Sequence, residues 1–168
     1  MNEIIRLGVL ADTHLTRLAD AVEFAERLLD GPFAGVEAIL HCGDMVLPDF
    51  ATVFGELPFY AVRGNMDPPH PDLPLKRIRT FGRFRIGMVH GWGAPAAVPF
   101  HALSEFSDQN LDLLLFGHSH VPYSSRQGKT LLFNPGSAMD HRGRHPFCTL
   151  GLIELSDRIE VRHLRFDP

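Results

Sequence analysis

The sequence contains few cysteines, no long hydrophobic run and no excess of basic residues. Two cysteines, Cys42 and Cys148, occur among 168 residues, and their placement does not resemble a disulfide framework, so we expect a reducing compartment. No apolar run reaches membrane-spanning length, and the chain enters a strand near Ile4 without a signal-peptide core. We therefore expect a cytoplasmic protein that makes no use of a membrane.

The charge balance bears on possible partners. The formal net charge of -4 argues against a general attraction to nucleic acid or to anionic membranes, and a local basic patch would still be compatible with it. Hydrophobic residues make up 45% of the chain and charged residues 21%, which is typical of a globular protein. Because the length suits one domain and no repeat or linker interrupts the pattern, we expect a single domain over residues 1–168.

One stretch suggests a metal site. The apolar run 111–116 predicts a buried strand, and Gly117-His118-Ser119-His120 follows where that strand should end. Side chains two residues apart on an extended segment point the same way, so His118 and His120 are expected to converge at the rim of a sheet. Two convergent imidazoles indicate a metal, whereas the simpler interpretation is a polar loop with two unrelated histidines.

The apolar pattern predicts an α/β order first and a largely β order later. We expect strands over 4–11, 36–40, 59–62, 75–81, 83–89, 111–116, 123–126, 130–133, 147–155 and 158–166. A helix is expected over 18–29, with shorter helices over 49–54 and 99–106. The early strand and helix alternation implies right-handed crossovers and a parallel sheet, whose ligands bind at the carboxyl ends of the strands.

Potential metal ligands follow five of these predicted strands. They are Asp12, His14, Asp44, Asn65, His90, His118 and His120. Taken singly, each aspartate is more often a turn former or helix cap, the asparagine a left-handed turn residue and each histidine a polar strand end. Together they suffice for two metal ions, with Asp44 as our candidate for the bridging carboxylate. Such a pair, about 3.5–4 Å apart, suits hydrolytic displacement at phosphorus. Oxygen and nitrogen ligands without thiolate suit manganese, our first expectation, and also iron, zinc, nickel or cobalt.

In order and spacing, these motifs resemble those of the calcineurin-like metallophosphoesterases. The segments that carry the resemblance are Asp12-Thr13-His14, Gly43-Asp44, Gly64-Asn65-Met66-Asp67, Val89-His90-Gly91 and Gly117-His118-Ser119-His120. Asn134-Pro135-Gly136-Ser137, with arginine at 142, is similar to the small subgroup that includes the bacterial YfcE phosphodiesterases and the retromer subunit Vps29. The resemblance implies a four-layer α/β/β/α sandwich with two mixed sheets and a dinuclear metal centre at their edge.

The resemblance also implies a ligand set and a reaction. One metal would take Asp12, His14, Asp44 and His120, and the other Asp44, Asn65, His90 and His118. A hydroxide that bridges the ions would be the nucleophile, and we expect Asp44, Asn65 and His90 to act in catalysis. The expected activity is that of a phosphodiesterase with a small phosphodiester or phosphomonoester substrate. The alternatives are a protein-interaction scaffold like Vps29 and, disfavoured by the acidic balance, a nuclease; a homo-oligomer is compatible with each.

One position departs from the family pattern. Many members carry a histidine directly after the asparagine, where it protonates the leaving group or binds phosphate, and this chain has Met66, which does neither. Proton donation contributes roughly 10²–10⁴-fold to such reactions, so substrates with poor leaving groups should suffer most. Asp67, His41 and His70 are the candidate substitutes.

Several other residues have two open interpretations. Trp92 is expected either to line a substrate pocket or to pack, and Arg142 and Arg144 either to meet phosphate oxygens or to be surface charge. Cys42 is expected to be a buried neighbour of the site, and 134–137 a turn near the metals. Four histidines are expected to be surface or supporting groups: His101, His141, His145 and His163.

Overall fold

The computed structural model describes residues 4–140 and 142–168. Its first sheet has five strands, three from the beginning of the chain and two from its end. The strands are β1 (Ile5–Leu10), β2 (Ala38–His41), β3 (Phe59–Ala61), β9 (Cys148–Leu155) and β10 (Ile159–Phe166). Their order is β10-β9-β1-β2-β3. β1, β2 and β3 are parallel, as the crossovers predict, and β9 joins β1 in the antiparallel sense. The carboxyl ends of β1, β2 and β3 therefore meet at one edge.

A second five-stranded sheet comes from the middle of the chain. Its strands are β4 (Lys76–Phe81), β5 (Phe84–Val89), β6 (Leu113–Leu115), β7 (Tyr123–Gln127) and β8 (Thr130–Asn134). Their order is β4-β5-β6-β8-β7, with the three central strands parallel and the two edge strands antiparallel to their neighbours. Both sheets are thus mixed, and in the second one the ends of β5 and β6 lie side by side.

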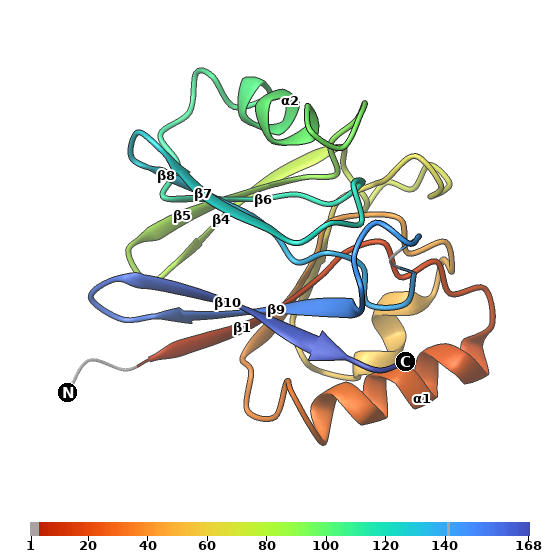
Figure 1. Cartoon of the computed structure of the whole chain (residues 1–168). Coiled ribbons are helices and arrows are strands. Elements are labelled where there is room, and N and C mark those ends of the chain that lie inside the picture. Colours follow the sequence, from red (N-terminus) through yellow and green to blue (C-terminus); the bar gives the residue numbers. More distant parts are fainter. Residues whose placement is uncertain (1–3, 141) are drawn as a thin grey trace.

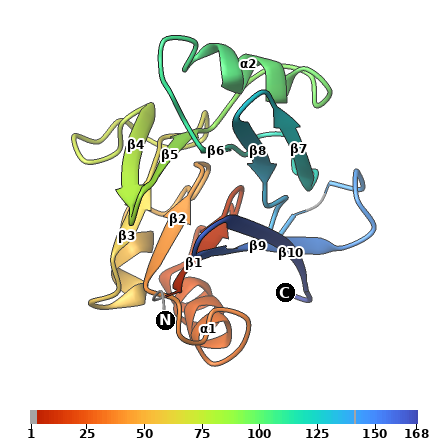
Figure 2. The same cartoon turned by 90° about the vertical axis from the view of Figure 1, so that its left-hand side faces the viewer.

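Helices cover the outer face of each sheet. α1 (Leu18–Leu29) lies against the first sheet and α2 (Val98–Ser104) against the second, so that Figures 1 and 2 show four layers from α1 to α2. The 3-10 helix η1 (Phe50–Phe54) packs beside α1. The buried residues of α1 repeat with helical spacing, Ala21, Phe24, Ala25 and Leu28, which is why this segment forms a helix with one apolar face.

The two sheets enclose the central part of the core. Leu113 and Leu115 of β6 pack between the sheets, whereas Leu114 faces the cluster that contains Val98 and Ala102 of α2. A strand that is buried on both faces reads as a continuous apolar run, which explains the pattern at 111–116. Rigid packing at this centre fixes where the strand ends lie.

The elements observed agree closely with those expected from the sequence. The helix 18–29 is found over the same residues, and the strand boundaries shift by at most two positions. The segment 49–54 forms a 3-10 rather than an α-helix, and the expected helix 99–106 begins at Val98 and ends at Ser104. In the part of the chain that the structure describes, no helix is both long enough and apolar enough to cross a membrane.

Candidate metal centre

The predicted ligands lie in loops that begin where five strands end. Asp12 and His14 follow β1, Asp44 follows β2, Asn65 follows β3, His90 follows β5, and His118 and His120 follow β6. Five of the seven have a backbone φ between 48° and 67°: Asp12, His14, Asp44, His118 and His120. Non-glycine residues rarely adopt this left-handed conformation, and where they do, the surrounding structure holds them there, most often at functional sites.

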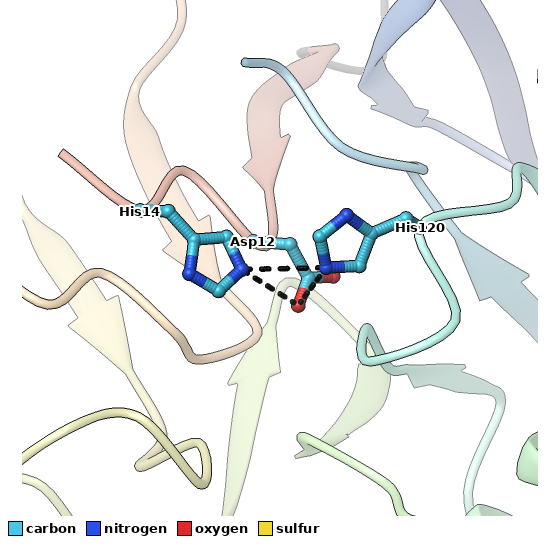
Figure 3. A group of neighbouring side chains, drawn as sticks. All are labelled: Asp12, His14 and His120. Carbon is cyan, nitrogen blue, oxygen red and sulfur yellow. Dashed lines mark hydrogen bonds and ion pairs between the residues drawn. The ribbon is translucent and has the colours of Figure 1, made fainter. Parts of the chain in front are cut away.

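Asp12, His14 and His120 form one group of potential ligands. Figure 3 shows the two imidazoles pointing toward the aspartate carboxylate, from the loop after β1 and the loop after β6. Asp12 Oδ1 lies 3.4 Å from His120 Nε2 and 3.9 Å from His14 Nε2, and these two nitrogens are 3.3 Å apart. Three ligand atoms thus converge on one point.

Asp44, His90 and Asn65 form the adjoining group, with Asp12 at the boundary between the two. Asp44 Oδ2 lies 3.5 Å from His90 Nε2 and 3.7 Å from His14 Nε2, so this oxygen faces both groups. Asp12 Oδ1 also faces both, since it is 3.9 Å from His90 Nε2. Either carboxylate is therefore placed to bridge two ions, and the expectation that Asp44 is the bridge stays a prediction.

The side chains of Asn65 and His118 complete the second group. Asn65 Oδ1 is 3.1 Å from His90 Nε2 and 3.1 Å from His118 Nδ1. His118 Nε2 donates to the carbonyl of Gly93 at 3.2 Å, so Nδ1 is the nitrogen that carries the free lone pair. All seven predicted ligands are brought to one edge of the two sheets.

One atom tests directly whether these residues suit a metal ion. Asp12 is fully buried, and its Oδ1 is the buried side-chain oxygen that has no hydrogen-bond partner among the described residues. A carboxylate oxygen left unpaired in a protein interior is costly unless a cation or a donor satisfies it. Imidazole nitrogens surround Asp12 Oδ1, and the donor set of carboxylates, amide and imidazoles is one that divalent transition metals accept.

The remaining polar atoms of these ligands are held by hydrogen bonds to the backbone. His90 Nδ1 donates to the carbonyl of Cys42 at 2.7 Å, and His120 Nδ1 donates to the carbonyl of Asp140, which leaves each Nε2 directed at the centre. Asp12 Oδ2 accepts from the amide of His118 at 2.9 Å. Supporting bonds of this kind fix the tautomer and orientation of metal ligands.

The charges of the centre are mutually dependent. Burial raises the pKa of Asp44, but hydrogen bonding and charge from His90 and the amide of Met66 outweigh it and lower the pKa to about 2. Burial lowers the pKa of His90, but Asp44 and Asp12 outweigh it and the net pKa is raised. Burial also lowers the pKa values of His14 and His118, and there it prevails. The two carboxylates thus attract positive charge, while His14 and His118 favour the neutral form that ligates metals.

A glycine allows the loop after β3 to approach Asp44. A Cβ on Gly64 would lie 2.1 Å from Asp44 Oδ1 and 2.4 Å from Asp44 N. Real Cβ atoms do not approach other atoms so closely, so a glycine is required here for the close contact. The Gly64-Asn65 pair therefore places the amide ligand beside the carboxylate.

Asp67 is a clamp for the backbone of this region. Its Oδ2 accepts from the amides of Asp44 and Gly64, and its Oδ1 accepts from the amide of Val46, each at 2.8 Å. Val46 itself has a φ of 72°, which is strained for a β-branched residue. With all three bonds made to the backbone, Asp67 positions Asp44 instead of facing the centre as a proton donor.

The other two candidates for a proton donor are also placed elsewhere. His41 is fully buried, its Nδ1 accepts from the amide of Gly43 at 3.1 Å, and its other nitrogen lies 3.1 Å from Thr13 Oγ1. Burial lowers its pKa to about 4, so it stays neutral at physiological pH. His70 lies on an exposed loop, where its Nδ1 accepts from the amide of Asp72 at 3.2 Å. Neither residue takes the place of the histidine that many family members carry at the position of Met66.

The segment 134–137 supports the centre as a turn. Ser137 Oγ donates to the carbonyl of Asp12 at 2.7 Å, and Asn134 Nδ2 donates to the carbonyl of Gly117 at 2.8 Å. The two arginines nearby are partnered, Arg142 with the Asp140 carboxylate at 3.2 Å and Arg144 with the carbonyl of Ser119 at 3.2 Å. These contacts favour structural roles for both arginines.

The remaining residues of interest are also located. Cys42 is buried, and burial raises the pKa of its thiol well above the usual value, which excludes an activated nucleophile. Trp92 lines a cavity beside the centre, together with Arg63. Arg63 was not selected from the sequence, and its position directly before Gly64-Asn65 was the only sequence signal that it lies near the centre. The imidazole of His101 contacts Trp92, that of His145 contacts Phe147, and that of His163 contacts the carbonyl of Asn134. His141 lies outside the described residues.

Comparison with known proteins identifies the family. Residues 5–158 match the model of the calcineurin-like phosphoesterase superfamily domain. The chain belongs to this superfamily. A protein of Methanothermobacter thermautotrophicus described as a probable metallophosphoesterase is 35% identical over 133 residues, which cover 78% of this chain and 76% of that protein.

Solved structures agree with this placement in the calcineurin-like superfamily. A predicted phosphoesterase from Streptococcus pneumoniae has 27% identity and a TM-score of 0.78, with 97% of this chain and 90% of that one covered. A mutant of Vps29 from Entamoeba histolytica has 21% identity and a TM-score of 0.71, with 97% and 100% covered, and it shares the fold. The α/β metallophosphoesterase fold with two mixed sheets, expected from the motifs, is thus confirmed, and the chain is a probable metallophosphoesterase with a candidate buried aspartate and histidine metal site.

Proposed function

We propose that this protein is a dinuclear metal-dependent phosphodiesterase, with Asp12, His14, Asp44, Asn65, His90, His118 and His120 as the metal ligands. The observation that carries the proposal is the buried and unpaired Asp12 Oδ1, which lies within 4 Å of three imidazole nitrogens. When bound, two divalent ions would activate water for attack at phosphorus and offset the charge that develops on the phosphate oxygens. Manganese is our first choice, and iron, zinc, nickel and cobalt are compatible with the same donors.

The residues of the chain would orient the substrate and hold the charges of the centre. Asn65 and His90 border the adjoining cavity, so a phosphate bound at this end of the cavity would contact these two side chains. The lowered pKa of Asp44 keeps its carboxylate ionised at neutral pH. We assign Asp44, Asn65 and His90 to contact with the reacting phosphate or with the ions that bind it.

Met66 underlies the proposed preference for diesters. Its side chain is 55% exposed beside Asn65, and its thioether carries neither a proton nor a charge. A phosphomonoester dianion carries one more negative charge than a diester, so the loss of a cationic group at this position disfavours monoesters more. Asp67 and His41 do not replace that group, because their hydrogen bonds are already made to the interior.

The test is hydrolysis of bis(p-nitrophenyl) phosphate and p-nitrophenyl phosphate by metal-stripped protein, with manganese, nickel, cobalt, zinc or magnesium restored one at a time. We expect metal-dependent turnover with the diester preferred. Asp44→Asn should abolish activity and reduce metal content together, whereas Asp20→Asn on α1, which removes the same charge far from the centre, should change neither. Normal turnover by Asp44→Asn would refute the assignment.

A non-catalytic scaffold like Vps29 is the competing hypothesis, and the surface bears on it. On the face of α1, Leu18 and Val22 are exposed, at 52% and 41%. Trp92 and Leu75 are also exposed and line the cavity beside the centre, whereas the exposed Phe100 lies on α2 outside the cavity wall. The exposed apolar side chains beside the centre support a site that binds a small ligand there. Tight binding of two ions without turnover by any metal form would favour the scaffold.

A further inference from the structure

A cavity of about 550 Å³ opens directly beside the metal centre. Asn65 and His90 form part of its wall, and the loop after β5 contributes Trp92. A volume of this size exceeds what a phosphate group alone needs and falls within the range of sites for small organic ligands. The cavity is therefore placed to receive one of the groups esterified to the reacting phosphate.

Trp92 gives this cavity an aromatic wall. The residue is 54% exposed, although a tryptophan that only packs is buried over most of its surface. One face of the indole is covered by the imidazole of His101, with ring centroids 3.6 Å apart and planes within 8° of parallel. The stack leaves the remaining surface of the indole open.

The surrounding backbone holds this aromatic pair in place. His101 Nδ1 donates to the carbonyl of Trp92 at 2.8 Å, which ties the loop to helix α2. A Cβ on Gly93 would lie 2.9 Å from His101 Cε1, so a side chain at that position would displace the imidazole. The pair is thus preorganised, and a flat ligand that stacks on Trp92 does not have to order it.

The cavity also contains an unpaired cation. Arg63 lines the cavity, and its guanidinium has no hydrogen bond or ion pair within the residues that the structure describes. The neighbouring Lys76 is occupied, since its Nζ donates to the carbonyl of Glu105 at 2.8 Å. Arg63 is therefore the cation available to an anionic ligand.

From these contacts we infer that the cavity binds a planar aromatic substituent of the substrate, stacked on Trp92, with Arg63 attracting the anionic phosphate. The substrate class is that of phosphodiesters with an aromatic ester group, among which nucleotide esters are the natural example. This inference rests on the proposed phosphodiesterase function. Stacking of a base on an aromatic side chain raises affinity roughly 10- to 100-fold.

Trp92 is the single tryptophan of the chain, so its fluorescence reports this contact and no other. We would titrate the purified protein with adenosine 5′-monophosphate and, in parallel, with ribose 5-phosphate, which carries the same phosphate without the base. The expected result is saturable quenching by the nucleotide at a concentration at least about tenfold below any effect of the sugar phosphate. Equal midpoints for the two probes, or no saturable quenching by the nucleotide, overturn the inference.

Variants separate stacking from a merely structural role of the loop. His101→Ala keeps the fluorophore but removes its support, and it should weaken nucleotide binding. Trp92→Leu, followed by calorimetry, should lose about tenfold or more in affinity for the nucleotide and none for ribose 5-phosphate. Phe100→Ala, which removes a 62% exposed aromatic residue on α2 outside the cavity wall, is the matched control. Nucleotide affinity unchanged by Trp92→Leu contradicts the inference.

Arg63 has its own test in the same assay. Arg63→Gln should weaken adenosine 5′-monophosphate more than uncharged adenosine, whereas Arg126→Gln on the exposed strand β7 should affect neither. An equal effect of Arg63→Gln on both probes overturns the role of Arg63.

Hydrolysis then distinguishes this inference from the proposed function. With thymidine 5′-(p-nitrophenyl phosphate), Trp92→Leu should raise KM at least about fivefold and leave kcat within about twofold, because stacking lies remote from the reacting bond. An unchanged KM overturns the stacking inference while the enzyme assignment stands. If the unaltered protein hydrolyses no diester with any metal, the proposed function fails, and the fluorescence titration still decides whether the cavity binds aromatic phosphates.

Discussion

Replacement of Asp67 by asparagine tests whether this carboxylate is a backbone clamp or a proton donor. In the structure it accepts three amide hydrogen bonds of 2.8 Å, from Asp44, Val46 and Gly64. Asparagine retains one carbonyl oxygen, which serves the Asp44 and Gly64 amides, and turns an NH₂ group toward the amide of Val46. One charge-assisted bond is therefore lost, and one buried donor is left facing another donor.

The expected loss of stability follows from the number of hydrogen bonds that the substitution removes. A hydrogen bond to a charged group contributes about 1.5–3 kcal/mol, so Asp67→Asn should lower the free energy of unfolding by roughly 2–3 kcal/mol. For a chain of this length, 1 kcal/mol corresponds to about 2–4 °C, which predicts a fall in Tm of roughly 4–12 °C. Because the clamp holds Asp44, metal affinity should also fall, by roughly 10- to 100-fold.

Thermal unfolding of the metal-free protein and metal titration measure the two effects. Asp72→Asn is the matched control, because its carboxylate is 94% exposed and the same charge is removed. If Asp67 were the proton donor, Asp67→Asn would keep its Tm and its metal affinity and would lose activity most strongly on substrates with poor leaving groups. That outcome would refute the clamp.

Three further predictions concern neighbouring residues. Met66→His should raise the rate on phosphoesters with poor leaving groups more than on p-nitrophenyl esters, as measured by the ratio of the two kcat/KM values. Gly64→Ala should abolish metal binding, measured by metal content, because its Cβ would collide with Asp44. The pKa of His41 is lowered to about 4 in the folded state, so its contribution to stability is complete above pH 6.5 and is lost as the pH falls toward 4. His41→Asn, whose oxygen can accept from the amide of Gly43, should lose less stability between pH 7 and 5 in denaturant unfolding of the metal-free protein.

Helices and strands whose apolar residues repeat with one clear spacing were predictable from the sequence. The helix 18–29 was found over the same residues because its apolar face and the Asp30-Gly31-Pro32 terminator agree. The segment 49–54 formed a 3-10 helix over Phe50–Phe54, in which Phe50 contacts Phe24 of α1, and so short a segment carries no apolar period that separates a 3-10 helix from an α-helix. Strand order in the second sheet was not predictable, because β5, β6 and β8 are joined by connections whose course the local pattern does not specify.

Within the centre, the sequence indicated which residues follow strands but not how their atoms are arranged. The left-handed φ of Asp12 and His14 is imposed by surrounding contacts, and non-glycine residues give no local signal for it. The role of Asp67 depends on amides up to 23 positions away, so it is visible only once the fold has formed. The orientation of Trp92 likewise depends on helix α2, whose His101 covers one face of the ring.

The division of the ligands between the two sheets has a consequence for biosynthesis. Asp12, Asp44 and Asn65 follow strands of the first sheet, whereas His90 and His120 follow strands of the second. No continuous half of the chain holds the complete proposed set, so an emerging polypeptide must extend through His120, and both sheets must dock, before all the proposed ligands are together. We therefore expect metal uptake at the proposed site to be a late event in maturation, after the two sheets have assembled.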